Sequence, residues 1–154
     1  MMEPAIALVE TNSVAAGILA GDTMVKKAVV QLLEARPVCP GKFLVLIGGE
    51  VGPVSESYRV GLAAAADTLV DQLLLPNVHL SVFPALMSAS PPRGDDALGI
   101  IETVTAAVCI VAADAAAKTT DVQLLEIRLA NGLGGKSFVL MEGSVADVEA
   151  AVAA

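Results

Sequence analysis

Apolar and polar residues alternate along the first half of the chain in blocks whose lengths suit strands and helices. Four segments are predicted to be strands: the apolar stretches at residues 6–10 and 43–47, and the mixed stretches at residues 30–36 and 69–75. Thr11-Asn12-Ser13, suited to capping a helix, opens an alanine- and glycine-rich segment that reaches residue 28. Gly52-Pro53 predicts the start of a second helix. The resulting β-α-β-β-α-β order predicts an α+β, ferredoxin-like fold, an antiparallel-rich sheet with its helices on one face.

The chain contains this pattern twice. Residues 5–36 and 97–128 are identical at 14 of 32 positions when shifted by 92 residues. The identities include Glu10 with Glu102, Asp22 with Asp114, Lys26 with Lys118, and the run 30–34 with 122–126. The register then slips by two residues, so that Gly41-Lys42 falls on Gly135-Lys136, and the difference lies in the loop that holds Cys39. A repeat of this kind predicts two structurally equivalent domains.

The repeat divides the chain into expected domains. We expect a first domain over residues 1–87, a polar, helix-breaking linker over 88–96 and a second domain over 97–154. By the second register Ala154 corresponds to Val60, so no residue of the second copy matches the strand at 69–75. A sheet without that strand would expose an edge, and we therefore expect a shortened chain rather than a domain that lacks a strand.

Composition and charge exclude several classes of function. The 154 residues carry nine Lys and Arg against seventeen Asp and Glu, a formal charge of -8 that disfavours nucleic acid as a partner. The longest uncharged apolar stretch, residues 103–113, is shorter than the roughly 20 residues of a membrane span. The start of the chain lacks the pattern of a secretory leader, and two cysteines make no disulfide framework. We expect a cytoplasmic protein that buries its apolar excess against neighbouring subunits.

Three features that suggest catalysis or ligand binding favour structural roles. The stretch 130–137 ends like a phosphate-binding loop in Gly-Lys-Ser, but Ala130 stands where its first glycine is required, and a strand is expected after Ser137. His79, the only histidine, follows a predicted strand without evident catalytic partners. Cys109 lies inside a predicted helix, where a buried thiol is the usual occupant. We expect no enzymatic activity.

Cys39 differs from Cys109 because it lies in a tight loop between two strands, with Lys42 nearby. One such thiol cannot hold a metal, but a threefold axis would bring three copies of the loop to one point. Three thiolates could hold an iron–sulfur cluster, with one iron left to another ligand, or a zinc ion. A plain free thiol is the alternative, and the residues alone leave the three interpretations open.

Several stretches resemble one protein family. They are Ala7–Thr11, Gly21–Ala28, Val38–Phe43, Leu69–Asp71, Leu98–Thr103 and Gly132–Lys136. With them the chain resembles the tandem-domain, trimer-forming shell proteins of bacterial microcompartments, and most of all the T-type members from propanediol-utilising compartments. The resemblance implies a homotrimer of six BMC domains, a flat pseudohexamer that tiles with other shell proteins around encapsulated enzymes in the cytoplasm.

The resemblance also implies roles for particular residues. Lys26 and Lys118 match the family's edge lysines, through which neighbouring tiles meet. Asn77 and His79 lie at the last edge turn, where Asn77 replaces an arginine common in the family. The residues that match the lining of the central pore are Cys39, Pro40, Gly41, Gly132, Leu133 and Gly134. In T-type members the loop cysteines of three subunits bind a [4Fe-4S] cluster, a role carried over to Cys39 alone, and electron transfer across the shell follows as an expectation.

Two alternatives belong to other functional classes. A soluble ferredoxin-like sensor would bind a small metabolite between its repeats. A redox enzyme would need a pocket with convergent polar groups, and the sequence shows no such set. Assembly into sheets with partner shell proteins distinguishes the shell protein from both.

Overall fold

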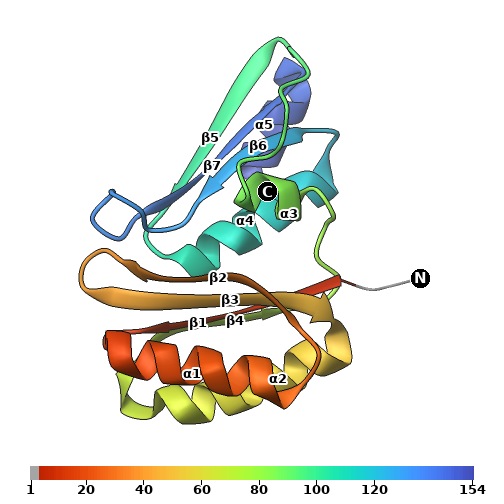
Figure 1. Ribbon diagram of the computed structural model, residues 1–154. Coiled ribbons are helices and arrows are strands. Elements are labelled where there is room, and N and C mark those ends of the chain that lie inside the picture. Colours follow the sequence, from red (N-terminus) through yellow and green to blue (C-terminus); the bar gives the residue numbers. More distant parts are fainter. Residues whose placement is uncertain (1–3) are drawn as a thin grey trace. The chain divides into compact units, whose positions relative to one another are not determined.

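The computed structural model describes residues 4–154, which form two compact units that divide between Val78 and His79. Each unit is an antiparallel sheet with helices packed against it (Figure 1). None of the described helices is long and apolar enough to cross a membrane.

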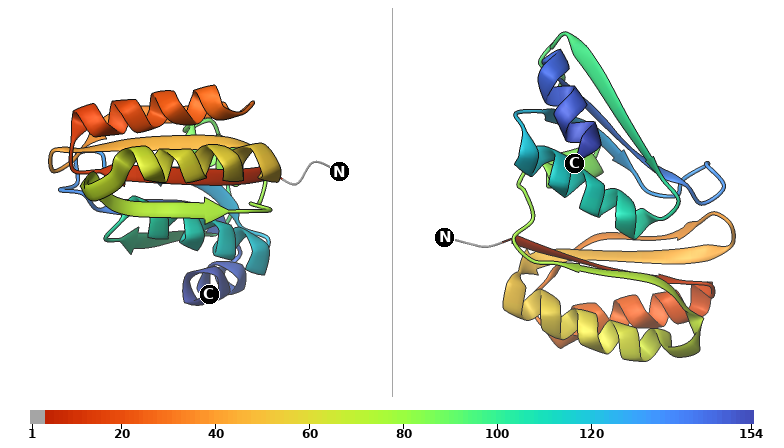
Figure 2. Two further views of the ribbon diagram at one scale, coloured as in Figure 1. Left: turned by 90° about the horizontal axis from the view of Figure 1, so that it is seen from below. Right: turned by 180° about the vertical axis from the view of Figure 1, so that it is seen from behind.

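The first unit has the expected β-α-β-β-α-β order. Its elements are β1 (Pro4–Thr11), α1 (Val14–Lys27), β2 (Gln31–Val38), β3 (Lys42–Glu50), α2 (Val51–Ala65), the short 3-10 helix η1 (Ala66–Thr68) and β4 (Leu69–Leu75). The strands are ordered β2-β3-β1-β4, and every neighbouring pair is antiparallel. Helices α1 and α2 lie side by side on one face of this sheet, as the views from two sides show (Figure 2).

The sequence explains how α1 starts and how it packs. The Ser13 side chain accepts a hydrogen bond of 3.3 Å from the Ala16 N–H, which caps the helix as expected. Small residues form much of its buried face and let the helix lie close to the sheet; Phe43 on β3 fills the space over Gly17, and Met24 fills the space over Gly61 on α2. The core of the unit comprises Ala5, Ala7, Val9, Ala20, Met24, Phe43, Val45, Ile47, Val54 and Ala65.

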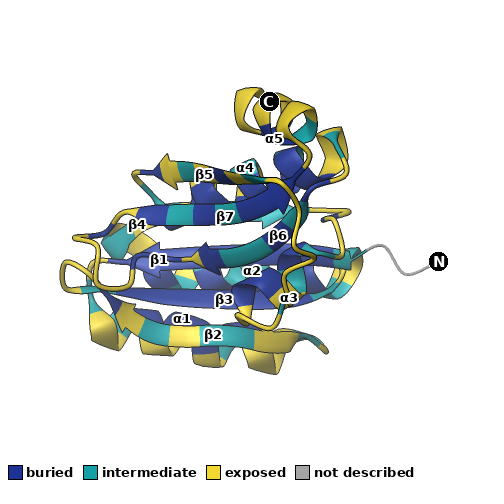
Figure 3. Cartoon of the chain, turned by 90° about the horizontal axis from the view of Figure 1, so that it is seen from above, coloured by how far each residue is buried: buried dark blue, intermediate teal, exposed yellow. Residues whose placement is uncertain are grey.

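The second unit repeats the fold over fewer elements. They are α3 (Val82–Leu86), β5 (Ala97–Thr103), α4 (Ala106–Thr119), β6 (Gln123–Arg128), β7 (Ser137–Gly143) and α5 (Val145–Ala153). The sheet has the order β5-β7-β6. The ladder slips between Leu124 and Glu126 as it does between Leu32 and Glu34 in the first unit, so even the β-bulge is repeated. Among the described residues no strand pairs with the free edge of β5, which carries exposed residues (Figure 3). Leu98 and Ile100 of β5 are exposed.

The structure differs from the sequence-based expectation after β4. Residues 79–87, which we expected in the first domain, belong to the second unit, because Val82, Ala85 and Leu86 of α3 are buried where this helix packs on β6 and α4. The segment 88–96 is free of helix and strand as expected. Arg93 within it forms ion pairs with Asp95 and with Asp121, so the segment is tethered to the second unit.

Candidate functional site

The loop between β2 and β3 presents a thiol to solvent. Cys39, Pro40 and Gly41 connect the two strands, and all three are exposed. The Cys39–Pro40 peptide bond is cis, and Gly41 has φ +69°, a left-handed conformation that suits glycine. Two paired strands therefore hold the Cys39 thiol at the tip of a tight hairpin.

A buried ion pair lies at the base of this loop. Lys42, the first residue of β3, forms an ion pair with Glu10 of β1, whose side chain is only 1% exposed. Loss of Lys42 would leave the buried Glu10 carboxylate without an opposite charge, which would strongly destabilise the folded state. The pair therefore holds the start of β3 against β1. We did not predict the pair from the sequence. The identity of both residues in the two copies, Glu10 with Glu102 and Lys42 with Lys136, is the signal that could have found it.

The equivalent loop of the second unit is longer and contains more glycine. It joins β6 to β7, and its expected pore residues Gly132, Leu133 and Gly134 are exposed. Gly132 and Gly134 have φ values of +73° and +63°. The base of the loop is held by a 3.0 Å hydrogen bond from the Ala130 N–H to the Ser137 hydroxyl. Because Ser137 begins the strand β7, the loop lacks the helix that a phosphate-binding loop requires, as predicted.

The ion pair of the first unit recurs in the second unit in a different environment. The Lys136 ammonium lies 2.7 Å from the Glu102 carboxylate, but both side chains are more than half exposed. In the first unit the strand β4 runs alongside β1 next to Glu10, whereas within residues 4–154 no strand pairs with the corresponding edge of β5. Among these residues the first pair is buried and the second is exposed.

The two cysteines differ sharply in their chemistry. Cys109 is buried in α4 as predicted, and burial raises the pKa of its thiol to about 12, although a hydrogen bond with Thr103 opposes the shift. A thiol with this pKa stays protonated at neutral pH and makes a poor metal ligand. Among residues 4–154 no group of three His, Cys, Asp or Glu side chains could hold a metal ion. One chain thus offers one exposed thiol, which fits a metal cluster only as one ligand among those from several copies.

The expected tile-edge residues lie at helix ends and in a turn. Lys26 in the last turn of α1 is exposed and forms a 2.7 Å ion pair with Asp22 at i, i+4 spacing, an ordinary solvated pair. Asn77, in the turn after β4, is exposed with φ +55°. His79 is also exposed, and its ring Nδ1 lies 2.7 Å from the Ser81 hydroxyl.

The corresponding pair of the second unit is not an ordinary solvated pair. Asp114 is 6% exposed, and its two oxygens accept hydrogen bonds from the Lys118 ammonium at 2.6 Å and from the His79 backbone N–H at 2.7 Å. The difference arises because the turn that leads into α3 covers this end of α4. The structure thus brings two of the expected edge residues, His79 and Lys118, to one carboxylate.

These features define a tandem-repeat α+β protein whose exposed thiol lies in a hairpin loop and whose candidate edge lysines lie near helix ends. A family model for the BMC domain matches residues 5–78 and 97–154, and the chain belongs to this family, the BMC-domain shell proteins of bacterial microcompartments. The bacterial microcompartment shell protein PduT of Citrobacter freundii is 45% identical over 151 residues, which are 98% of this chain and 82% of that protein.

Solved structures agree with this assignment. The crystal structure of a microcompartments protein from Desulfitobacterium hafniense superimposes with a TM-score of 0.94 at 54% identity, over 100% of this chain and 85% of that chain. A fused, permuted hexameric shell protein of the RMM microcompartment has a TM-score of 0.64 at 21% identity, over 98% and 81% of the two chains, and shows a similar fold. The expected pair of tandem BMC domains is thereby confirmed.

Proposed function

We propose that the chain is a structural tile of a bacterial microcompartment shell, in which three copies close into a ring of six BMC domains. The observation that carries the proposal is the repetition of the strands β1, β2 and β3 as β5, β6 and β7, down to the bulge shared by β2 and β6. Because the two units share this framework, three chains can approximate a six-membered ring with closed symmetry. Membership of the BMC family and the similarity to PduT support a place in the shell, beside other shell proteins in the bacterial cytoplasm.

In this ring the hairpin loops surround the central opening. Cys39, Pro40 and Gly41 from each first domain alternate with Gly132, Leu133 and Gly134 from each second domain. Three Cys39 thiolates would hold a [4Fe-4S] cluster, together with a fourth ligand that is not a cysteine of this loop. Such a cluster exchanges one electron at a time, and so would connect a reduced carrier on one side of the shell with an oxidised carrier on the other. The exposed position of Cys39, in contrast to the buried Cys109, supports this choice of ligand.

The cluster is tested by anaerobic purification, iron and sulfide analysis, and EPR of the reduced protein. We expect about one cluster for every three chains, because each chain supplies one thiolate to a shared site. Cys39→Ser should lose it, whereas Cys109→Ser should retain it, since Cys109 is buried and protonated. A wild-type protein without iron or sulfide after reconstitution would remove the redox role and leave the shell role standing.

The trimer is tested separately by analytical ultracentrifugation of the full chain. A species of three chains supports the ring. A protein that stays a single chain at all accessible concentrations, and forms no sheets with a hexameric shell protein, contradicts the proposed tile.

A further inference from the structure

The loop between β6 and β7 contains the dipeptide Asn131-Gly132, in which a backbone nitrogen lies next to a side-chain amide. Both residues are exposed, and the loop extends beyond the ends of its two strands (Figure 1). Within residues 4–154, neither the Asn131 side chain nor the Gly132 N–H forms a hydrogen bond. Gly132 has φ +73°, and a Cβ built on it would meet no atom within 4 Å apart from those of its chain neighbours. The Gly132 nitrogen is therefore free to approach the Asn131 side chain.

The chain has two other asparagines, and neither has this combination of features. Asn77 is also exposed, but the next residue is Val78, whose N–H donates a 2.8 Å hydrogen bond to a backbone carbonyl. Asn12 precedes Ser13, the residue that caps α1. A side chain on the following residue obstructs the approach of that residue's own nitrogen, and only glycine lacks a Cβ. Asn131 is the one asparagine in the sequence that a glycine follows.

We propose that Asn131 is a self-modification site, at which the chain converts this asparagine to an aspartyl or isoaspartyl residue without an enzyme. The Gly132 nitrogen loses its proton and attacks Cγ of Asn131, so that a C–N bond forms and the side-chain nitrogen leaves as ammonia. Water then adds to either carbonyl of the resulting succinimide and breaks the C–N bond there. The net change is the gain of water and the loss of ammonia, with no oxidation or reduction. The reaction is intramolecular because both groups belong to adjacent residues.

The conversion changes both the charge and the backbone of the loop. It replaces a neutral amide by a carboxylate and so adds a negative charge to a chain whose formal charge is -8. The isoaspartyl product also inserts a methylene group into the backbone of the loop. The consequence for the central opening rests on the proposed ring, in which three of these loops border the opening. There the new carboxylates would attract cations and repel anions, so the opening would change its charge with time after synthesis.

The conversion is measured by mass spectrometry after incubation of the full chain in mildly alkaline buffer, which favours loss of the Gly132 proton. Trypsin cleaves after Arg128 and Lys136 and releases residues 129–136 as one short peptide. The converted peptide is heavier by the difference between OH and NH₂, and an isoaspartyl methyltransferase labels the isoaspartyl form. A sample digested at the start corrects for conversion during the digest. We expect the converted fraction to rise with time and with pH, while the peptide that contains Asn77 stays unconverted over the same period.

Two glycines of the same loop provide a matched pair of variants. Gly132 and Gly134 have φ values of +73° and +63°, and both have open space around an added Cβ, but only Gly132 follows the asparagine. Gly132→Ala should slow the conversion by about tenfold or more, because its Cβ obstructs the attacking nitrogen, whereas Gly134→Ala should stay within about twofold of wild type. Asn131→Gln should show no conversion over the same period, because the longer side chain would have to close a larger ring. Far-UV circular dichroism checks that each variant is folded.

The outcomes separate this inference from the proposed ring. Conversion at Asn131 that is lost in Gly132→Ala and kept in Gly134→Ala supports the modification site, whatever the oligomeric state of the chain. An Asn131 that stays unconverted, that converts no faster than Asn77, or that converts equally in the two glycine variants overturns it, even if the chain forms trimers. A chain that forms no trimer removes only the consequence for the central opening.

Discussion

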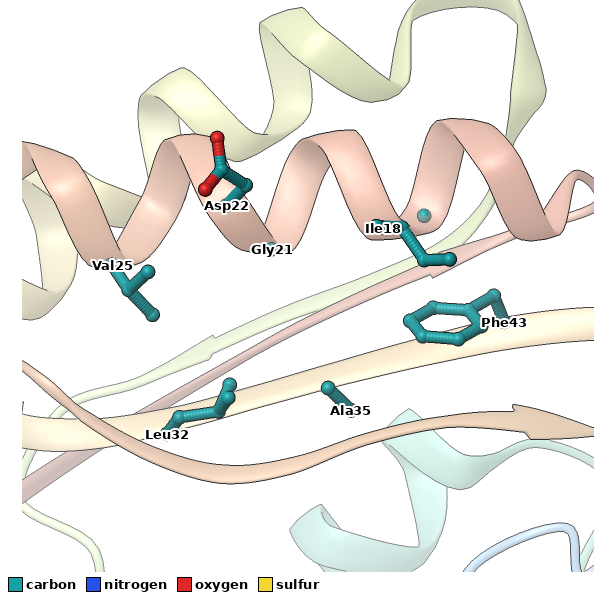
Figure 4. Close-up of a pocket in the computed structure, with 8 residues that line it drawn as sticks. Ile18, Gly21, Asp22, Val25, Leu32, Ala35 and Phe43 are labelled. Atoms are coloured by element: carbon teal, nitrogen blue, oxygen red, sulfur yellow. The ribbon is translucent and has the colours of Figure 1, made fainter.

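Gly17 offers a specific test of how closely α1 packs against β3. A Cβ added at this position would lie 2.6 Å from both Cβ and Cδ1 of Phe43, which real carbon atoms do not tolerate. Phe43 is buried against α1 (Figure 4), and its Cβ is bonded directly to the backbone of β3 and cannot rotate away. The clash can therefore be removed only by a shift of β3 or of α1. In the second repeat Cys109 occupies the position of Gly17, and Ser137 occupies the position of Phe43. The larger side chain on the helix accompanies the smaller one on the strand.

We therefore expect Gly17→Ala to destabilise the first unit. Overpacking costs about 1–3 kcal/mol, and replacement of a helical glycine returns up to about 1 kcal/mol. Gly52→Ala is the control, because Gly52 is also helical and an added Cβ would meet no atom within 4 Å other than those of its chain neighbours and its own helix backbone. Relative to that control, Gly17→Ala should lower the urea midpoint by about 1 M, from a slope of about 1–3 kcal/mol per M.

Tyr58 makes the assay specific for the first unit. It is the only tyrosine, the chain has no tryptophan, and it lies on α2 with its hydroxyl donating to Gln72 at 2.8 Å. Its fluorescence therefore reports unfolding of the first unit alone. Equal midpoints for Gly17→Ala and Gly52→Ala would refute the reasoning.

Three further predictions use the same repeat or the buried thiol. Asp114→Ala should destabilise the second unit by about 1–3 kcal/mol, because it leaves the His79 N–H and the Lys118 ammonium without their acceptor. Asp22→Ala should change the stability of the first unit by less than about 0.5 kcal/mol. Hydrogen exchange of the amides in α4 and α1 measures both effects, and equal effects would contradict the structure. Cys109 should not react with a thiol reagent in the folded chain. Because its pKa is raised from 9.0 to about 12, its stabilising contribution is complete below pH 9 and is lost as the pH rises from 9 towards 12, so denaturation curves across this range should show a larger loss in wild type than in Cys109→Ser; equal losses would contradict the prediction. Lys26→Ala should weaken sheet formation seen by electron microscopy and leave the proposed trimer intact, while Lys27→Ala, one residue along α1, serves as the control; unchanged sheets in Lys26→Ala would count against the edge role.

The sequence predicted those elements that carry a local start or stop signal. Ser13 marked the start of α1, and Pro76-Asn77 marked the end of β4, whose bounds at Leu69 and Leu75 were predicted without error. The comparison of the two copies gave the domain repeat and the hairpin position of the Cys39 loop. These signals are short-range or depend on identity between copies, so they are visible without any knowledge of packing.

The features that we missed depend on contacts between distant parts of the chain. Helix α3 has only five residues, contains Pro84 and has no equivalent in the second copy, so neither periodicity nor the repeat indicates it. Its absence from the prediction made Asp114 look like Asp22, although the turn into α3 covers Asp114 and leaves Asp22 exposed. Likewise the Glu10 carboxylate and the Lys42 ammonium are far apart in sequence, and only the register of β1 against β3 brings them together.

The buried ion pair between Glu10 and Lys42 makes the Cys39 hairpin insensitive to ionic strength. Salt at 1 M reduces the screening length to about 3 Å, but a buried pair is screened much less than an exposed one. The amide signal of Gly41 should therefore stay in place as salt is added. The Cys39 thiol is thus held at one position whatever the concentration of electrolyte around the protein.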